Sequence, residues 1–504
     1  MEPLELLLFT TQFEHFNRAC EILQKNITFI DTSQTGCGKT YISLSLAKHF
    51  VIPILVFCPL AVVKNWDDLI KDFGIPSRGV FNYESLTGNV NSQPSVDILH
   101  RTNERNEGKK VKPIYTVTES FRAMMKEGTL LVLDEGHKFK NDSAVTKAVT
   151  ALTTALIDSV LIDGTRSRCC ILSATLADKE EQIENMFKVL GFVRNEKYID
   201  VNKQTALVTY TGLQELLLIC NRYDRAMTES IMARYTVTSK TLKKVVYELF
   251  VKVVAPRIMS KMEPPKIEGE RDAKNGYYKM NDITSKLLDE AIEELSHAAG
   301  YRDDGTVDGE TKVTIGAITT SLRNIESCKV NLFARLAKRD LDDVPNSKVI
   351  CCLNYLANID ALRVTLAEYN PMILTGEIPI KQRNMIIKLF QTSPYHRLLI
   401  CNPKVGGVGI SLHDIVGNSP RFMYISPTYS IQDSHQAAGR IYRIGTKSKA
   451  TIRFVYGNGK NKETGILNAL AIKSKILEEV SGSSGVLFPG QYPNEIEGEM
   501  IQPK

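Results

Sequence analysis

NITFIDTSQTGCGKTYISLSLAKHF, residues 26–50 of the 504-residue chain, is the stretch that decides the fold. Its apolar start predicts a buried strand over Asn26–Thr32, and YISLSLAKHF predicts a helix. The glycine-rich turn SQTGCGKT, Ser33–Thr40, lies between the two. A strand, a glycine-rich turn and a helix N-terminus direct several backbone N–H groups at one point, which makes a cradle for an anion. The stretch therefore predicts a phosphate-binding loop in an α/β protein.

The side chains of this turn suit a nucleotide. Gly36 and Gly38 let the backbone wrap around a phosphate, Lys39 reaches the β- and γ-phosphates, and the Thr40 hydroxyl can bind Mg²⁺. The strict pattern G-x-x-x-x-G-K-[ST] has glycine where this chain has Ser33, so a small residue still begins the loop. The alternative is a chance glycine-rich turn, which the flanking strand and helix disfavour.

Further buried strands follow on both sides of a more polar middle. Pro53–Pro59, Gly128–Glu135 and Arg168–Thr175 are apolar almost throughout, as parallel strands must be when helices cover both faces of the sheet. A second set, KVICCL, MILTG, HRLLICNP and RFMYISP, begins near Lys348 and is separated by helical patterns such as IKQRNMIIKLFQ. The sequence therefore predicts two α/β units, each a doubly wound parallel sheet.

The predicted organisation has four segments. A first lobe covers 1–245, a linker with a helical insertion covers 246–345, a second lobe covers 346–480, and a flexible tail covers 481–504. SKLLDEAIEELSHA in the second segment has helical periodicity. The polar, partly basic stretch Gly88–Lys112 interrupts the first lobe, and we expect it on the surface.

A second chemical signal is LLVLDEGHKFKN, Leu130–Asn141. Two carboxylates at the tip of an apolar strand are costly to bury together without a cation. Asp134 beside a phosphate-bound Mg²⁺ is one solution, with Glu135 orienting the attacking water. His137 could sense the phosphate state and pass it to neighbouring elements. Alone this string is often a strand end and a polar loop, but with the phosphate loop it indicates an NTPase.

The third signal is QAAGRIYRIG, Gln436–Gly445, in the second α/β unit. Arg440 and Arg443 are three residues apart, so on a helix they would share a face. Their planar guanidinium forks suit phosphate oxygens. The alternative is a solvated basic face. If these arginines complete an ATP site begun in the first lobe, hydrolysis is tied to the relative motion of the lobes.

These three motifs, in this order, resemble those of the superfamily two helicases and translocases, and finer matches resemble their SWI/SNF-like group. Gln12, 27 residues before Lys39, resembles the adenine-reading glutamine of that group. CPLAVVKNWDDLI, with Trp66, resembles its motif of Pro followed by Trp, and DEGHKFKND resembles its D-E-x-H-x-x-K-N signature. LSAT, LTGEIPIKQRNMIIKLFQ, NPKVGGVGISLHD and ETGILNALAIKSKIL resemble further motifs. The resemblance covers residues 5–480.

The resemblance implies two RecA-like lobes with helical insertions between them, and an ATP-dependent nucleic-acid motor that uses ATP and Mg²⁺. Double-stranded DNA is the favoured partner, because the SWI/SNF-like signatures imply movement along a duplex. The nearest alternative is a strand-separating helicase acting on RNA or single-stranded DNA. A nucleic-acid-binding scaffold with weak ATPase activity, or a metabolic P-loop kinase, is less favoured because the motif set is complete.

The resemblance also gives roles to residues of this chain. Lys39, Glu135, Arg440 and Arg443 are the expected catalytic residues. The expected nucleotide-binding residues are Gln12, Gly36, Cys37, Gly38, Lys39, Thr40, Asp134 and Gln436, with Thr40 and Asp134 as metal ligands. The expected residues for coupling or nucleic-acid contact are His137, Ser173, Thr175, Gly406, Gly407 and Gly409. Trp66 is expected in the core rather than stacked on a base, and Arg101–Lys112 is open between nucleic-acid attraction and a solvated loop.

Three departures separate the chain from the usual SWI/SNF-like pattern. LSAT stands where the group usually has Gly-Thr-Pro, and ISPTYSIQDSHQAAGR lacks the usual Asp and Trp-Asn-Pro. Thr446 follows RIG where the group usually has Gln. In these respects the chain resembles the compact helicases of large DNA viruses.

Composition excludes several other classes. With 43% hydrophobic and 24% charged residues the chain is globular rather than disordered. No apolar stretch approaches the roughly 18 residues of a membrane span, and MEPLELLLFTTQF carries acids where a signal peptide carries Lys or Arg. We therefore expect an intracellular protein, neither secreted nor membrane-bound. The ten cysteines form no C-x-x-C pair and fit a reducing compartment, and the net charge of +6 permits a polyanionic partner.

Overall fold

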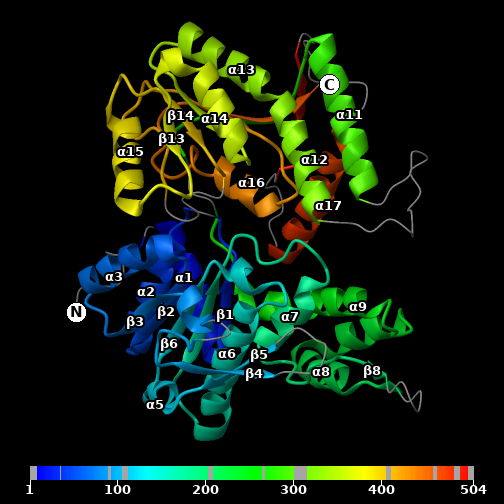
Figure 1. Ribbon diagram of the computed structural model, residues 1–504. Coiled ribbons are helices and arrows are strands. Elements are labelled where there is room, and N and C mark those ends of the chain that lie inside the picture. Colours follow the sequence, from blue (N-terminus) through cyan, green and yellow to red (C-terminus); the bar gives the residue numbers. More distant parts are fainter. Residues whose placement is uncertain are drawn as a thin grey trace. The chain divides into compact units, whose positions relative to one another are not determined.

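The computed structural model describes residues 8, 10–34, 36–88, 92–104, 112–201, 208–263, 267–299, 315–403, 410–457, 463–481 and 489–497. The chain divides into two compact units (Figure 1). The first comprises Met1–Pro265 with Lys475–Val486, and the second comprises Lys266–Ser474 with Leu487–Lys504. Each contains one parallel sheet with helices packed on it, which confirms the predicted α/β architecture.

The sheet of the first unit has six parallel strands in the order β10-β1-β7-β6-β2-β3. The strands are β1 (Thr28–Asp31), β2 (Ile54–Cys58), β3 (Ser77–Asn82), β6 (Leu130–Asp134), β7 (Arg168–Leu172) and β10 (Met259–Ser260). The four strands that the apolar runs predict in this unit, β1, β2, β6 and β7, are confirmed. Every residue of β1, β2 and β6 is buried, as expected for strands covered on both faces.

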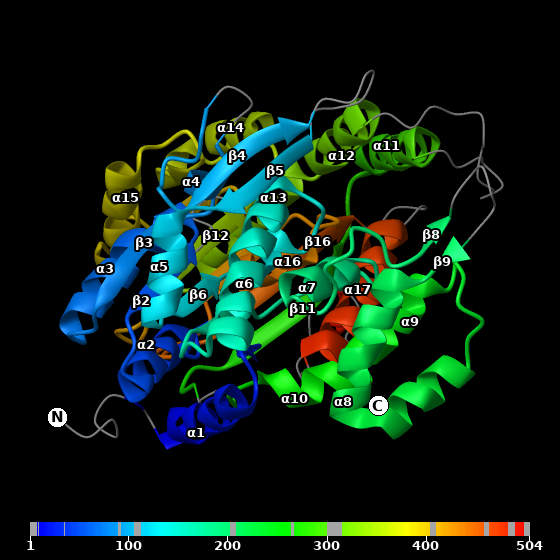
Figure 2. The same cartoon turned by 90° about the horizontal axis from the view of Figure 1, so that it is seen from below.

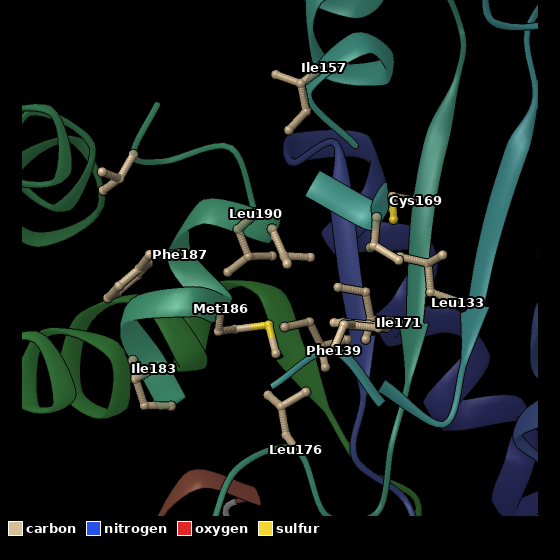
Figure 3. Close-up of a cluster of buried hydrophobic side chains, with 14 of the residues drawn as sticks. Leu133, Phe139, Ile157, Cys169, Ile171, Leu176, Ile183, Met186, Phe187 and Leu190 are labelled. Atoms are coloured by element: carbon tan, nitrogen blue, oxygen red, sulfur yellow. The ribbon is translucent and has the colours of Figure 1, made fainter. Parts of the chain in front are cut away.

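Helices cover both faces of this sheet (Figure 2). One face carries α1 (Thr10–Lys25), α2 (Lys39–Phe50) and α3 (Val63–Asp72). The other carries the largest core cluster, built on α5 (Glu119–Glu127), α6 (Ala144–Asp163), α7 (Gln182–Val189), α8 (Thr211–Ala233) and α9 (Leu242–Leu249). Figure 3 shows part of this cluster, in which Leu133 and Ile171 of the sheet lie near Phe139, Leu176 and Met186.

The sheet of the second unit has seven parallel strands in the order β13-β14-β12-β15-β16-β11-β17. They are β11 (Arg271–Tyr278), β12 (Lys348–Cys352), β13 (Met372–Leu374), β14 (Leu398–Cys401), β15 (Arg421–Ile425), β16 (Ala450–Gly457) and β17 (Asn494–Ile496). The structure confirms the predicted strands β12, β13, β14 and β15.

The helices of the second unit also cover two faces. Core clusters place α13 (Val330–Asp343) and α14 (Leu356–Thr365) on one face, and α15 (Ile380–Thr392) and α16 (Ile431–Ala438) on the other. α11 (Asp282–Ala298) packs against α12 (Ile315–Cys328), as the helical periodicity of the predicted insertion indicates. The last long helix, α17 (Thr464–Ser481), begins in the second unit, and its residues from Lys475 onward belong to the first.

The remaining elements are short. They are η2 (Leu60–Val62), α4 (Glu84–Thr87), β4 (Leu99–Glu104), β5 (Lys112–Val117), η3 (Gly136–Phe139), β8 (Asp200–Val201), β9 (Val208–Thr209), η4 (Phe250–Val254), α10 (Ala255–Ile258) and η5 (Ala367–Tyr369). β4 lies in the polar stretch Gly88–Lys112 that was expected on the surface, and it pairs antiparallel with β5, which begins at the last residue of that stretch. Leu99 and Tyr115 of this pair are buried, so one face of the hairpin packs on the core while the other is polar.

The predicted segment boundaries differ from the units of the structure. Residues 246–265 of the predicted linker belong to the first unit, and 266–345 belong to the second. β11 lies in that linker and pairs with β16 in the second sheet. The predicted flexible tail contains β17, which pairs with β11, and Tyr492, whose ring is buried. Both strands are partly polar and pair with distant segments, so local apolar runs do not reveal them.

Helix α6 corrects the expectation that no stretch approaches the length of a membrane span. Ala144–Asp163 has 20 residues and a mean hydropathy of 1.5 over an 18-residue window. By length and composition alone, the helix is therefore long and apolar enough to cross a membrane. Its Val149, Leu152 and Leu156 side chains lie in the core of the first unit. Packing in the core therefore accounts for the apolar residues of one face of this helix, whereas Leu161 and Ile162 near its end are exposed.

Candidate active site

The phosphate loop of the first unit leaves β1 at Asp31 and enters α2 at Lys39. Gly36 and Gly38 have φ angles of 89° and 91°, in the region that side chains with a Cβ rarely adopt. A Cβ on Gly38 would also lie 2.2 Å from the Gln12 Nε2 atom. Both glycines of the motif are therefore required by the backbone that they form.

Lys39 and Gln12 are both bound to this loop. The Lys39 Nζ atom donates to the Ser33 carbonyl oxygen at 2.7 Å and to the Gln34 carbonyl oxygen at 3.0 Å. Gln12, buried on α1, donates from Nε2 to the Cys37 carbonyl oxygen at 3.0 Å. The structure thus brings the predicted nucleotide residues Gln12, Cys37 and Lys39 together, with Thr40 half-buried in the first turn of α2.

Asp134 and Glu135 stand at the end of β6, as predicted. Glu135 has a φ angle of 56°, an unusual conformation for a residue other than glycine, and its N–H donates to the Asp134 Oδ1 atom at 2.9 Å. Burial, together with the neighbouring Glu135 charge, raises the pKa of Asp134 to about 6. Such a carboxyl group would regain its full negative charge beside a cation.

His137 acts on Glu135 rather than on Asp134. Its Nδ1 atom lies 3.1 Å from the Glu135 Oε2 atom. Burial opposes the charge on Glu135, but the hydrogen bond and the charge of His137 outweigh it and lower the pKa of the Glu135 carboxyl. The two neighbouring carboxyl groups therefore differ in pKa, with Glu135 the more strongly ionised.

Two aromatic residues that the sequence analysis gave no catalytic role hold Asp134. The Trp66 Nε1 atom donates to the Asp134 Oδ2 atom at 3.0 Å, and the Tyr83 hydroxyl donates to the Asp134 carbonyl oxygen at 2.6 Å. Trp66 is fully buried, so its expected core position is confirmed, although its indole N–H has a further partner. The only signal for this contact was the Pro-then-Trp motif after the second strand.

The segment after β7 lies beside this turn. The Ser173 N–H donates to the Asp31 carbonyl oxygen at 3.0 Å, and the Thr175 N–H donates to the Ser173 Oγ atom at 3.3 Å. A Cβ on Gly136 would lie 3.3 Å from the Ser173 Cβ atom. Both predicted side chains are buried, so protein atoms cover them. Their positions suit coupling between the loop and the Asp134 turn better than direct nucleic-acid contact.

A polar network that the sequence analysis missed joins the catalytic turn to α7. Lys140 forms a buried ion pair with Asp178, the Gln182 Nε2 atom donates to the Asn141 Oδ1 atom at 3.1 Å, and Asn185 donates to the Lys140 carbonyl oxygen. Beneath it, Phe139, Leu176 and Met186 lie together in the core (Figure 3). Lys140 and Asn141 are the last residues of the D-E-x-H-x-x-K-N signature, so the structure shows what these two side chains bind.

Strand β10 is hydrogen-bonded to the start of the phosphate loop. The Thr32 N–H donates to the Ser260 carbonyl oxygen at 3.0 Å. The Met262 N–H donates to the Ser33 Oγ atom at 2.8 Å. Ser33 is the residue that departs from the strict glycine pattern, and here its hydroxyl oxygen is used as an acceptor.

A buried contact between Asp31 and His15 also stabilises the start of the phosphate loop. The Asp31 Oδ1 atom accepts from the Ser33 N–H at 2.9 Å, and its Oδ2 atom lies 3.1 Å from the His15 Nε2 atom. The other ring nitrogen of His15 lies 3.2 Å from the Ser260 Oγ atom. Burial opposes the Asp31 charge, but His15 outweighs it and lowers the pKa of Asp31. His15 thus connects α1, β1 and β10.

The arginines of the second unit do not lie on a helix, which corrects the prediction of a shared helical face. α16 ends at Ala438 and carries Gln436, whereas Arg440 and Arg443 follow in an irregular segment. Gly439, a poor helix former, stands at the end of the helix. The segment is therefore a turn rather than a continued helix.

Neutral oxygens hold both arginines. The Arg440 Nη2 atom donates to the Pro403 carbonyl oxygen at 2.9 Å, and the Arg443 Nη1 atom donates to the Ser411 Oγ atom at 2.8 Å. Burial and the neighbouring Arg440 charge lower the pKa of Arg443 to about 10, so it remains a cation at neutral pH. The predicted Gly406, Gly407 and Gly409 lie outside the described residues.

Comparisons with known proteins agree with these observations. Residues 329–445 match the helicase conserved C-terminal domain. The chain is 24% identical over 472 residues to the "Putative ATP-dependent RNA helicase L364" of Acanthamoeba polyphaga mimivirus, a match that covers 92% of this chain and 81% of that protein. It is 23% identical over 486 residues to the DNA repair and recombination protein RDH54 of Saccharomyces cerevisiae (strain AWRI1631), covering 90% of this chain and 48% of that protein. The chain spans about half the length of this second relative.

A solved structure also aligns with the chain. The Sulfolobus solfataricus SWI2/SNF2 ATPase core in complex with dsDNA is 15% identical, with a TM-score of 0.31, and the alignment covers 94% of this chain and 93% of that one. These matches support an ATP-hydrolysing enzyme similar to the SWI/SNF-like group of the superfamily two helicases. They agree with the predicted family. The helicase-domain match and the helicase relatives indicate an ATP-hydrolysing nucleic-acid motor, and the viral character of the motifs agrees with the mimivirus relative.

Proposed function

We propose that this SWI/SNF-like ATPase couples ATP hydrolysis to movement along duplex DNA. The observation that carries the proposal is the network of Lys140 and Asn141 with Asp178 and Gln182, which joins the catalytic turn to the segment after β7. Lys140 and Asn141 belong to the D-E-x-H-x-x-K-N signature that resembles that of duplex-tracking motors. The name of RDH54, a DNA repair and recombination protein, supports DNA as the partner.

The residues of the first unit fit ATP with Mg²⁺. The left-handed glycines form a concave loop, Lys39 is held on two carbonyls inside it, and Asp134 is a buried carboxyl group with a raised pKa. Thr40 and Asp134 would hold the metal, whose charge would stabilise the departing phosphate, and the nucleotide would supply the bond that is hydrolysed. Glu135, kept ionised by His137, would orient the attacking water and accept its proton.

Gln12 and the second-unit residues complete the proposal. Gln12 would read the adenine while it supports the loop through Cys37. Arg440 and Arg443, with Gln436 nearby in the sequence, would offset the phosphate charge that develops during hydrolysis. Guanidinium groups suit this role because their planar forks match phosphate oxygens.

A second candidate function is strand separation on RNA. The observation that favours it is the mimivirus relative, whose name includes RNA helicase and which matches most of the chain. Both functions use the same ATP site, so only the response to the polynucleotide separates them.

The test is ATP hydrolysis with no polynucleotide, duplex DNA, single-stranded DNA or RNA, with Lys39→Ala as the blank. Lys48→Ala, on the same helix but outside the loop, is the matched control. Stimulation by duplex DNA, followed by displacement of a third strand from a triplex, is the expected result. Stimulation by RNA or single strands alone would replace duplex movement with strand separation, and no hydrolysis under any condition would sink both.

A further inference from the structure

A pocket of about 290 Å³ in the first unit belongs to none of the sites described above. It lies between α1, α10 and α8, which follow one another in that order along one side of this unit (Figure 2). Asn26, which lines it, lies two residues before the start of β1 at Thr28, whereas the phosphate loop follows the same strand. The pocket and the nucleotide loop therefore lie at opposite ends of β1.

Neutral polar groups of the pocket bind one another. The Tyr223 hydroxyl donates to the Asn26 Oδ1 atom at 2.8 Å. The Asn26 Nδ2 atom donates to the Ile22 carbonyl oxygen at 3.1 Å and to the Arg257 carbonyl oxygen at 3.3 Å. α1, α8 and α10 are thereby joined at one point, although they are far apart in the sequence. Because these neutral groups already bind one another, the charged side chains of the pocket are the ones available to bind a ligand.

Those charged side chains are strongly unbalanced. Arg18, Lys25, Arg222 and Arg257 line the pocket with a single carboxylate, Glu21, which already pairs with Arg18 at 3.0 Å. Within the described ranges of the chain, Lys25, Arg222 and Arg257 make no ion pair. Cations gathered around one hollow repel one another, and an anion bound there relieves the repulsion. Guanidinium groups are particularly suited to phosphate.

We propose that this pocket is a second phosphate site, separate from the nucleotide loop. Its ligand is a phosphate group of a nucleic-acid backbone or of a free polyphosphate. The assignment to nucleic acid rests on the proposed function, whereas the phosphate chemistry rests only on the pocket. Contacts of this kind carry no base specificity, but they raise affinity and make it depend on salt.

The test compares two double variants of equal charge. Arg222→Gln with Arg257→Gln removes two pocket cations. Arg225→Gln with Lys252→Gln removes two exposed cations of the same region that pair with Glu229 and Glu248 outside the pocket. Binding of labelled duplex DNA is followed by anisotropy over a salt series without nucleotide. Binding of tripolyphosphate is followed by calorimetry with Lys39→Ala added, so that the phosphate loop contributes little.

The pocket variant is expected to bind duplex DNA about tenfold more weakly than the control variant, and its salt slope is expected to fall by about two. Loss of tripolyphosphate binding with unchanged DNA binding would instead assign the site to free polyphosphate. Equal behaviour of the two variants in both assays would overturn the proposal. A protein without ATPase activity but with this DNA-binding difference would sink the proposed function and leave the phosphate site standing.

Discussion

The charged residues of the two units are held in different ways. In the first unit, Glu135 and Asp31 each lie against a histidine, and Asp134 accepts from an indole. In the second, Arg440 and Arg443 donate to neutral carbonyl and hydroxyl oxygens. Charges in the first unit are thus adjusted by specific neighbours, whereas the neutral Ser411 hydroxyl orients Arg443 without cancelling its charge. The first arrangement suits chemistry, and the second suits attraction of an anion.

Glu135→Gln should have the largest effect of any change in either unit. Glutamine keeps the size of the side chain but cannot accept a proton, so we expect hydrolysis to fall about 10³-fold while ATP binding changes little. Single-turnover hydrolysis and binding of a fluorescent ATP analogue measure the two quantities. Glu127→Gln, at an exposed ion pair with Arg78, is the control. A rate near that of the unchanged protein would remove Glu135 from the proposed mechanism.

Arg443→Gln tests the second unit in the same way. If Arg443 offsets the phosphate charge that develops during hydrolysis, removing its charge should lower the rate of hydrolysis about 10²-fold. We expect little loss of stability. Arg397→Gln is the matched control, since Arg397 also donates to neutral oxygens, those of Ser347, Leu341 and Val344. That variant should lose stability and keep its rate per folded molecule. If the two variants behave alike, Arg443 is only a structural residue.

Much of the fold follows from the sequence because burial of parallel strands leaves a local record. β1, β2, β6 and β12 are buried along their whole length, so they are apolar apart from residues at their ends. β11, RDAKNGYY, begins with polar and charged residues and is completed only by pairing with β16 and β17. Its place in the sheet depends on distant partners, which no local pattern records.

The candidate site divides in the same way. The loop glycines and Asp134 were predictable because phosphate binding needs particular residue types at fixed spacing. The hydrogen bond from Trp66 to Asp134 was not predictable, because the sequence does not distinguish an indole that donates to a carboxylate from any other buried aromatic residue. That Arg440 and Arg443 lie in a turn could not be predicted, because the spacing of two arginines says nothing about where α16 ends.

Trp66→Phe should have a smaller effect, confined to the first unit. The substitution keeps an aromatic ring but leaves the Asp134 Oδ2 atom without its donor, so we expect unfolding free energy to fall by about 1–3 kcal/mol. We also expect the Mg²⁺ concentration for half-maximal hydrolysis to change, because the carboxylate loses its orientation.

Tyr83→Phe is the matched control for that change. Its hydroxyl binds the Asp134 carbonyl oxygen rather than the carboxylate, so stability should fall while the Mg²⁺ requirement stays the same. Urea unfolding and Mg²⁺ titration of hydrolysis separate the two effects. An unchanged Mg²⁺ requirement in Trp66→Phe would mean that the indole N–H only stabilises the fold.

Ser33→Gly should have the smallest effect of these changes. It tests the hydrogen bond that connects the phosphate loop to the segment leading into the second unit. The substitution restores the strict glycine pattern but removes the oxygen that accepts from the Met262 N–H, three residues before the first unit ends at Pro265. Because one hydrogen bond is worth about 1 kcal/mol, we expect polynucleotide stimulation of hydrolysis to fall about fivefold. Ser33→Ala should do the same, whereas Ser77→Ala, which removes an acceptor for the Gly79 N–H on β3, should not. A stimulation ratio that Ser33→Gly and Ser33→Ala leave intact would show that the bond shapes the loop without relaying nucleotide binding toward the second unit.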